Sequence, residues 1–161
     1  MSLSIQEKGQ RFLDNLPHCQ RLGLSVVGGG ENQLTMRLPY AENIVGNPLS
    51  GALHGGALTT LMDTASGTAV FAVLPGYELC PTLDLRMDYM KAAAAGVDLI
   101  AEAKVIRISK NVVFTECLVY QEQDHDLVAR CAAAFMRIGA ELTPPEFEAA
   151  IENNRPMEVT L

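Results

Sequence analysis

The chain has 161 residues, which is long enough for one domain with a full hydrophobic core and too short for two domains of ordinary size. Its 12 basic and 19 acidic residues give a net charge of -7, which argues against binding to a nucleic-acid backbone. No apolar run approaches the roughly 20 residues that span a bilayer, and "MSLSIQEKGQRF" lacks the apolar core of a signal peptide. We therefore expect a cytoplasmic protein with no membrane and no nucleic-acid partner.

The four cysteines are scattered along the chain and form no CxxC pair. This spacing offers neither a zinc knuckle nor a redox motif, so we expect no metal site. Cys117 and Cys131 lie in strand-like runs, where a thiol acts as a small hydrophobic group. We expect both to be buried.

The first half of the chain predicts two helices and a hairpin. Residues 3–16 place apolar side chains loosely at helical intervals, and Pro17 is expected to end this short helix. Residues 22–38 alternate apolar and polar positions around a glycine run, which predicts a β-hairpin that turns at Gly28 to Gly30. After the turn-forming stretch "PYAENIVGNPLSG", apolar residues continue from Leu53 to Leu74 for about six turns and predict the longest helix.

Four strand-like segments follow: "TLDLRMDYM", "VDLIAEAKVIRI", "NVVFTECLVYQ" and "LVARCAAAFMRI". Their apolar residues alternate, with a phase slip near Ile106 that indicates a bulge. Short connections imply antiparallel pairing, so we predict the α+β class, with about six strands covered on one face by the long helix. One domain is expected over residues 1–161, with a helix at about 3–16, a core at about 21–138 and a C-terminal tail or helix at about 143–161.

One face of the long helix is small and mostly polar. At 100° per residue it collects Gly56, Thr59, Thr60, Asp63, Ser66, Gly67 and Val70 within about 60° of one line. Asp63 is therefore expected to face a slot lined by small residues instead of the core. A partly desolvated carboxylate in such a slot is a stronger base or nucleophile than one in water, which suits acyl transfer.

The start of this helix offers a second set of groups. Gly55 and Gly56 place unpaired backbone N–H groups where the helix dipole favours negative charge, and such groups can hold an oxyanion. His54 precedes Asp63 by nine residues, about 13 Å along the axis and roughly 180° around it. Both can serve one site only if a second copy supplies one of them, which favours a dimer. Alternatively, His54 caps the helix, the glycines form a tight turn, and Asp63 hydrogen-bonds nearby threonines.

The ordered combination of "GNPLSGALHGGALTTLMDTASG" and "TLDLRMDYMKAAAAG" resembles the hotdog-fold acyl-CoA thioesterases of the PaaI-like (phenylacetate-degradation) family, especially its medium- and long-chain branch. The likeness runs from about Asn47 to Phe135. It implies a hotdog fold, an antiparallel sheet wrapped around one long central helix. It also implies a homodimer with two sites at the subunit interface, often paired into a tetramer as a dimer of dimers, and no cofactor.

The resemblance assigns a role to each of five residues. Asp63 would attack the thioester or activate water, and Gly56 would offer its backbone N–H to the thioester oxygen. Asn47 and His54 would orient substrate or water from the neighbouring subunit, and Thr82 would help to hold the water. Whether Asp63 acts covalently or as a general base stays open.

By the same resemblance, contacts to substrate and coenzyme A would come from Gly55, Thr64, Lys91, Lys110 and Asn111. The predicted reaction is hydrolysis of an acyl-CoA to a free acid and coenzyme A. Medium or long straight acyl chains fit the branch resemblance, and aryl groups stay open. Two alternatives remain: a hotdog hydratase or dehydratase, and a non-catalytic hotdog protein that binds acyl-CoA.

Overall fold

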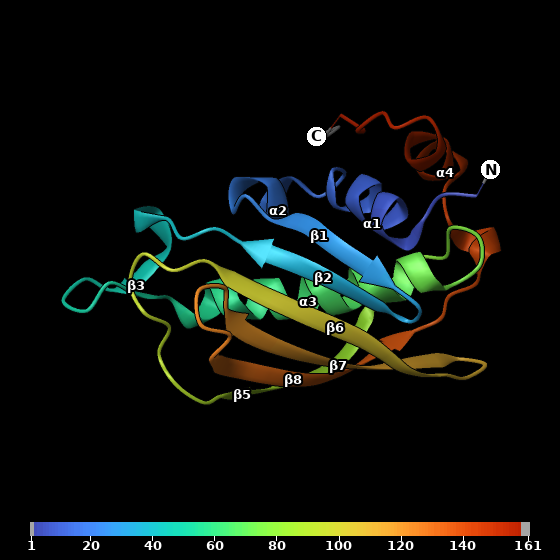
Figure 1. Cartoon of the computed structure of the whole chain (residues 1–161). Coiled ribbons are helices and arrows are strands. Elements are labelled where there is room, and N and C mark those ends of the chain that lie inside the picture. Colours follow the sequence, from blue (N-terminus) through green and yellow to red (C-terminus); the bar gives the residue numbers. More distant parts are fainter. Residues whose placement is uncertain (1, 159–161) are drawn as a thin grey trace.

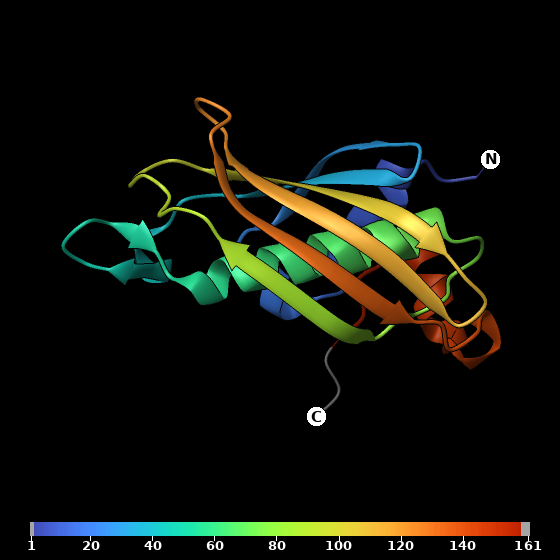
Figure 2. The same ribbon diagram turned by 90° about the horizontal axis from the view of Figure 1, so that it is seen from below.

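The computed structural model describes residues 2–158. Its main feature is a six-stranded antiparallel sheet that curves around one long helix, α3 (Gly55–Val73), as Figures 1 and 2 show from two directions. The strands lie in the order β1-β2-β6-β7-β8-β5, with bounds β1 Ser25–Gly30, β2 Gln33–Leu38, β5 Thr82–Tyr89, β6 Leu99–Ile108, β7 Val112–Gln121 and β8 Leu127–Met136. The predicted α+β class and the sheet wrapped around a central helix are confirmed. Residues 1 and 159–161 of the predicted domain lie outside the described residues.

Alternation along the strands decides which side chains meet α3. The inward positions of β6 are buried and mostly small: Leu99, Ala101, Ala103 and Val105. β8 repeats this pattern with buried Ala129, Cys131, Ala133 and Phe135. Small inward residues let the helix lie close to the sheet, where burial of its apolar side chains stabilises the fold.

Two details of this region agree with the sequence. The register of β6 against β7 shifts between Val105 and Arg107, so Ile106 is the expected bulge residue. Cys117 and Cys131 are buried and lie opposite each other on β7 and β8. Both predictions are confirmed.

The predicted end of the N-terminal helix is wrong. Helix α1 spans Ile5–Leu13, and Pro17 begins a second short helix, α2 (Pro17–Arg21). The reason is that the fixed φ and the missing N–H of proline suit the first turn of a helix as well as they stop one.

The predicted hairpin is present, but its turn lies elsewhere. Glu31 and Asn32 form the turn, and Asn32 takes up the left-handed region with a φ of 59°. The glycine run belongs to β1, where it serves packing instead: a Cβ at Gly29 would come within 3.0 Å of the Gln6 backbone nitrogen in α1. The absence of side chains there lets α1 lie directly on the strand.

The segment before α3 holds a small hairpin that the sequence presents only as a loop. After η1 (Glu42–Ile44), β3 (Val45–Asn47) pairs with β4 (Ala52–Leu53). This hairpin projects beyond the six-stranded sheet, at the left of Figures 1 and 2. Leu49, between its strands, is 97% exposed.

The C-terminal segment forms η2 (Ala140–Leu142) and then helix α4 (Pro145–Glu152), which lies beside α1. The sequence predicts a tail or a helix here, and residues 145–152 form a helix. Arg11 of α1 donates hydrogen bonds of 3.0 and 2.8 Å to the last carbonyls of α4. The Phe12 ring stacks on Phe71 of α3 at 4.4 Å and meets Phe147 of α4 edge-on at 6.0 Å. These contacts join α1, α3 and α4 into one aromatic cluster.

Candidate active site

Asp63 lies on α3 next to the first residue of β5. The Thr82 hydroxyl donates a hydrogen bond of 2.9 Å to Asp63 Oδ1, and the aspartate is half-buried. The structure therefore brings together two residues that lie 19 positions apart in the chain. A hydroxyl held on a carboxylate in this way is an arrangement that can position a water molecule for attack.

The predicted polar face of α3 is narrower than the sequence indicates. Ser66 and Val70 are both 0% exposed, because they point into the core between helix and sheet. Thr59, Thr60, Asp63 and Gly67 remain at least partly accessible, and Thr64 joins them. Asp63 thus faces a short accessible strip, as predicted, but the strip ends earlier than expected.

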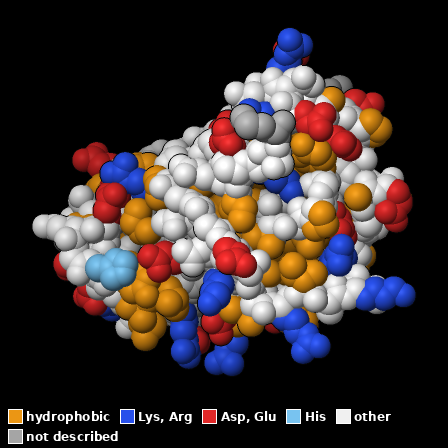
Figure 3. Space-filling model, turned by 45° about the vertical axis from the view of Figure 1, so that its right-hand side comes forward, with side chains coloured by type: hydrophobic (Ala, Val, Ile, Leu, Met, Phe, Trp, Pro, Cys, Tyr) orange, Lys and Arg blue, Asp and Glu red, His pale blue; other side chains and the backbone are white. Residues whose placement is uncertain are grey.

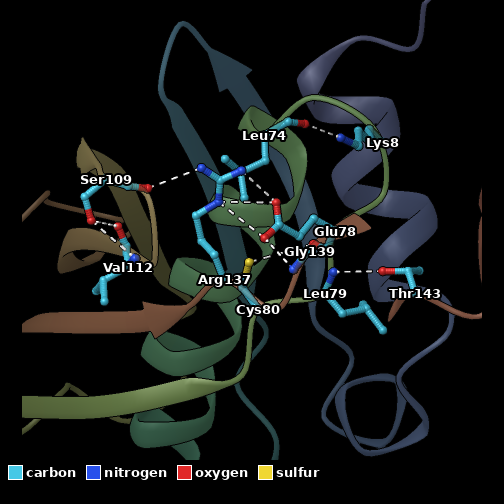
Figure 4. A network of polar contacts seen from close by, with 10 residues as sticks. All are labelled: Lys8, Leu74, Glu78, Leu79, Cys80, Ser109, Val112, Arg137, Gly139 and Thr143. Carbon is cyan, nitrogen blue, oxygen red and sulfur yellow. Dashed lines mark hydrogen bonds and ion pairs between the residues drawn. The ribbon is translucent and has the colours of Figure 1, made fainter. Parts of the chain in front are cut away.

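A buried ion pair holds the segment that delivers Thr82 to Asp63 (Figure 4). Glu78 has a side chain that is only 4% exposed, and Arg137 at the end of β8 donates to it at 2.8 Å. The Gly139 N–H donates a further bond of 3.1 Å to the same carboxylate. Hydrogen bonds from Arg137 lower the pKa of Glu78 below its usual range. The segment between α3 and β5 is therefore tied to the end of β8, which lies beside the start of β5.

The start of α3 is closed by its own residues. The Gly56 N–H donates a hydrogen bond of 2.8 Å to Nδ1 of His54, which is the N-cap of the helix. The Gly55 carbonyl accepts bonds from Tyr89 at 3.1 Å and from Thr59 at 3.0 Å. His54 therefore caps the helix, as the alternative interpretation of the sequence predicts. Because its imidazole occupies the Gly56 N–H, that N–H can bind an oxyanion only after the imidazole turns away.

Asn47 lies on the projecting hairpin and is exposed. Its Oδ1 accepts a hydrogen bond of 3.0 Å from the Leu49 N–H, and its carbonyl accepts one of 2.8 Å from Gly51. The hairpin packs tightly on the helix start, since a Cβ at Gly46 would come within 2.6 Å of the His54 Cα. Asn47 is thus held on the same side of the molecule as His54.

The ten predicted site residues fall into two groups within one chain. The Asp63 cluster contains Asp63, Thr64 and Thr82, with Lys110 and Asn111 in the β6–β7 turn at the same end of the sheet. The helix-start cluster contains Asn47, His54, Gly55, Gly56 and Lys91. Along α3, Asp63 lies seven residues or about 10 Å beyond Gly56, and along β5 Thr82 and Tyr89 lie about 23 Å apart. A single chain therefore does not assemble all ten around one point.

The two predicted lysines differ in their surroundings. Lys91 borders a cavity of about 290 Å³ with Gly55 and Tyr89, and it forms an ion pair with Asp126. The hydrogen bond to Asp126 raises the pKa of Lys91. Lys110 is exposed in the β6–β7 turn, where the neighbouring Asn111 carbonyl accepts a bond of 2.8 Å from the Arg137 N–H.

Sequence reasoning misses several of these contacts. Glu78 and Arg137 are 59 residues apart, so no local pattern links them. The only sequence signal for Glu78 is a lone acid in the apolar stretch "YELCP".

Among residues 2–158, no group of three or more His, Cys, Asp or Glu side chains gathers to hold a metal ion, and no helix is long and apolar enough to cross a membrane.

An antiparallel sheet wrapped around a long helix defines the hotdog class, and in this chain the helix carries a carboxylate beside the first residue of β5. The family model of the thioesterase superfamily matches residues 50–128. A Halobacterium salinarum protein that carries a provisional esterase name is 35% identical over 118 residues, which cover 71% of this chain and 77% of that protein. The chain belongs to the thioesterase superfamily, a family of thioester hydrolases.

Other relatives support this placement. Human acyl-coenzyme A thioesterase 13 is 30% identical over 83 residues, covering 50% of this chain and 56% of the human protein. A crystal structure of a Pseudomonas aeruginosa protein is 48% identical, with a TM-score of 0.75, and covers 83% of this chain and 99% of that one. A mutant form of the Thermus thermophilus phenylacetic acid degradation protein PaaI is 26% identical, with a TM-score of 0.66, and covers 76% of this chain and 99% of that one. The PaaI-like resemblance is confirmed, whereas the medium- or long-chain branch stays a prediction.

Proposed function

We propose that the protein hydrolyses acyl-CoA thioesters and that each active site combines the Asp63 cluster of one subunit with the helix-start cluster of another. The observation that carries this proposal is the Asp63–Thr82 hydrogen bond of 2.9 Å beside a cavity on α3. The name of the human relative, an acyl-coenzyme A thioesterase, supports the substrate class. The chain spans less than two thirds of that relative, so the support concerns this domain alone.

In this mechanism, Asp63 acts on the thioester carbonyl carbon, either directly or through a water molecule that Thr82 helps to orient. The carbonyl oxygen gains negative charge, and the Gly56 N–H of the partner copy stabilises it once His54 releases that N–H. On the water route, Asp63 takes a proton from the attacking water, the carbon–sulfur bond breaks, and the coenzyme A thiolate takes up that proton as the free acid forms. On the direct route, the thiolate leaves as Asp63 forms a mixed anhydride with the acyl group, and a water molecule then hydrolyses this anhydride, which gives the free acid, restores the Asp63 carboxylate and supplies the proton that the thiolate takes up. Asn47 and His54 would orient the substrate.

Binding of coenzyme A would use exposed polar groups of both clusters. Lys110, Asn111 and Thr64 lie on the Asp63 side, and Lys91 and Gly55 lie on the helix-start side. Because Lys91 already pairs with Asp126, its attraction for a phosphate is partly offset. Lys110 is therefore the stronger of the two candidates for a phosphate contact.

The cytoplasmic location expected from the sequence stays a prediction.

We also expect the dimers to pair through the outer face of the sheet. Four exposed apolar residues lie on strands β6, β7 and β8 of the sheet: Ile106, Ile108, Phe114 and Met136. Figure 3 shows one face of the molecule, on which hydrophobic surface is interspersed with charged side chains. A second dimer that covered such surface would bury apolar area, which supports the predicted tetramer. Sedimentation of the Phe114→Glu variant as a dimer would support this expectation, and an unchanged tetramer would contradict it.

The Asp63→Asn variant tests the reaction. The amide keeps the size of the side chain but removes the base, so thiol release from acyl-CoA should fall at least about 100-fold while the circular dichroism spectrum stays unchanged. Asp84→Asn is the matched control, because Asp84 is exposed on the neighbouring strand and lies opposite Ala134. Wild-type activity in Asp63→Asn would sink the proposal. Tight binding of acyl-CoA by the wild type without thiol release would favour a non-catalytic binder, and hydration of an enoyl-CoA would favour a hydratase.

A further inference from the structure

A cavity of about 170 Å³ lies beside Asp63. Asp63, Gly67 and Phe71 of α3 line it at steps of four residues, so it follows one side of the helix for about 12 Å. Thr82 at this cavity is exposed, whereas Phe71 and Phe135 are only 2% and 1% exposed. The cavity therefore leads from the surface at the Asp63–Thr82 pair towards the interior.

The inner part of the cavity is apolar. Phe12 and Leu16, from the N-terminal segment, line it together with Phe71 and Phe135. Cys80 also borders it, and burial raises the pKa of the Cys80 thiol to about 11, so the sulfur stays protonated and uncharged near neutral pH. A lining of this kind favours an apolar occupant over water.

The wall that α1 supplies is anchored at several points. The Lys8 ammonium donates a bond of 2.7 Å to the Leu74 carbonyl at the end of α3 and lies 4.9 Å from the centre of the Phe71 ring. Arg11 ties α1 to α4, and the Phe12 ring stacks on Phe71 at 4.4 Å. Phe12 is thus a fixed end wall and not a loose surface side chain.

The volume of the cavity limits what can enter it. An apolar cavity of about 150 Å³ in another protein stays dry and takes up benzene. At about 170 Å³, this cavity suits one ring or a chain of about six carbons, and a longer chain that continued along α3 from Asp63 would meet the stacked rings of Phe71 and Phe12.

We propose that the cavity receives the end of the acyl group and that Phe12 of α1 sets the largest acyl group the protein accepts, a single ring or about six carbons. This assignment rests on the proposed function, because it places the thioester at Asp63. It gives the N-terminal helix, which lies outside the matched family region of residues 50–128, a direct part in substrate choice.

The test compares acyl groups of graded size. Thiol release is measured from acetyl-, hexanoyl-, phenylacetyl- and decanoyl-CoA, and binding is measured calorimetrically with the thioether analogues S-hexyl- and S-decyl-CoA, which cannot be hydrolysed. Wild-type kcat/KM should be about tenfold or more lower for decanoyl- than for hexanoyl-CoA, and Phe12→Ala should reverse that ratio by removing the end wall. Phe147→Ala is the matched control, because Phe147 packs on Phe12 and Phe71 without lining the cavity. It should leave the ratio unchanged.

A filling variant keeps the test independent of the stability of Phe12→Ala. A methyl at Gly67 would lie 3.4 Å from the Phe135 ring, an ordinary contact, so Gly67→Ala should fold and should narrow the cavity. It should lower phenylacetyl and hexanoyl turnover about tenfold while sparing acetyl turnover. Hydrolysis with a length preference that ignores both substitutions would overturn the cavity assignment and leave the proposed function standing. If the thioether analogues bind with the predicted size limit but no thioester is hydrolysed, the cavity assignment stands and the proposed function is overturned.

Discussion

The two clusters of predicted site residues are held in place in opposite ways. The Asp63 cluster is fixed by contacts from within the chain: Thr82 bonds to Asp63, and the Glu78–Arg137 pair holds the segment before Thr82. The helix-start cluster has its key donor occupied, since the Gly56 N–H is bonded to His54, and Asn47 lies on a hairpin whose Leu49 is 97% exposed. The Asp63 cluster is therefore held in place by its own chain, whereas the helix-start cluster presents exposed groups beyond the sheet, where a second copy can reach them. A site shared between two subunits needs such a pair: one cluster that is fixed and one that is exposed to the partner.

The largest expected change in stability comes from breaking the support of the Asp63 cluster. Arg137→Met leaves the Glu78 carboxylate buried without its partner, so the free energy of unfolding should fall by about 3 kcal/mol in urea titrations. Arg130→Met is the matched control, because Arg130 pairs with Asp88 on the surface, where loss of the ion pair should cost less than about 1 kcal/mol. Equal losses in the two variants would show that the buried pair is not a special support.

The same pair predicts a pH dependence. The pKa of Glu78 is lowered in the folded state by Arg137, so the unfolded chain binds the proton more readily as the solution is acidified. The stability that the pair contributes is fully present above the ordinary glutamate pKa of about 4.3 and is lost as the pH falls through the lower folded value. The difference in unfolding free energy between wild type and Arg137→Met should therefore shrink below about pH 4. A difference that grows on acidification would contradict this assignment.

A smaller effect is expected at the start of α3. His54→Ala removes the side chain that caps the helix, and this should lower the free energy of unfolding by about 1 kcal/mol. His18→Ala serves as control, because His18 is exposed and its imidazole approaches the Thr60 hydroxyl only to 3.4 Å. If both variants were equally stable, the His54–Gly56 bond would have no capping value.

The smallest effect on the folded chain is expected at the hairpin tip. Leu49→Ser removes an apolar side chain that is 97% exposed, so the stability of the isolated chain should change by less than about 0.5 kcal/mol. If the hairpin lies against a second copy, the same change should raise the dimer dissociation constant about tenfold or more in analytical ultracentrifugation. An unchanged dissociation constant would show that the hairpin does not contribute to the interface.

Periodicity in the sequence predicts α3, the strands, the Ile106 bulge and the separation of His54 from Asp63, because these depend on neighbouring residues. It misplaces features with two local solutions: Pro17 can end a helix or begin one, and glycines can form a turn or let a helix approach a strand. It misses the Glu78–Arg137 pair and the Phe12 wall, because both join segments far apart in the chain. Long-range contacts of this kind leave no local pattern.

A mixed dimer tests the shared site most directly. Asp63→Ala and the double variant Asn47→Ala/His54→Ala are each expected to be inactive as homodimers, because every site lacks either the Asp63 carboxylate or the two side chains that orient the substrate. A heterodimer of the two, purified through different tags on each chain, has one interface site with both clusters intact, so its activity should recover to about half that of the wild type. A heterodimer as inactive as the two homodimers would contradict the account, since it would place both clusters of each site in one chain.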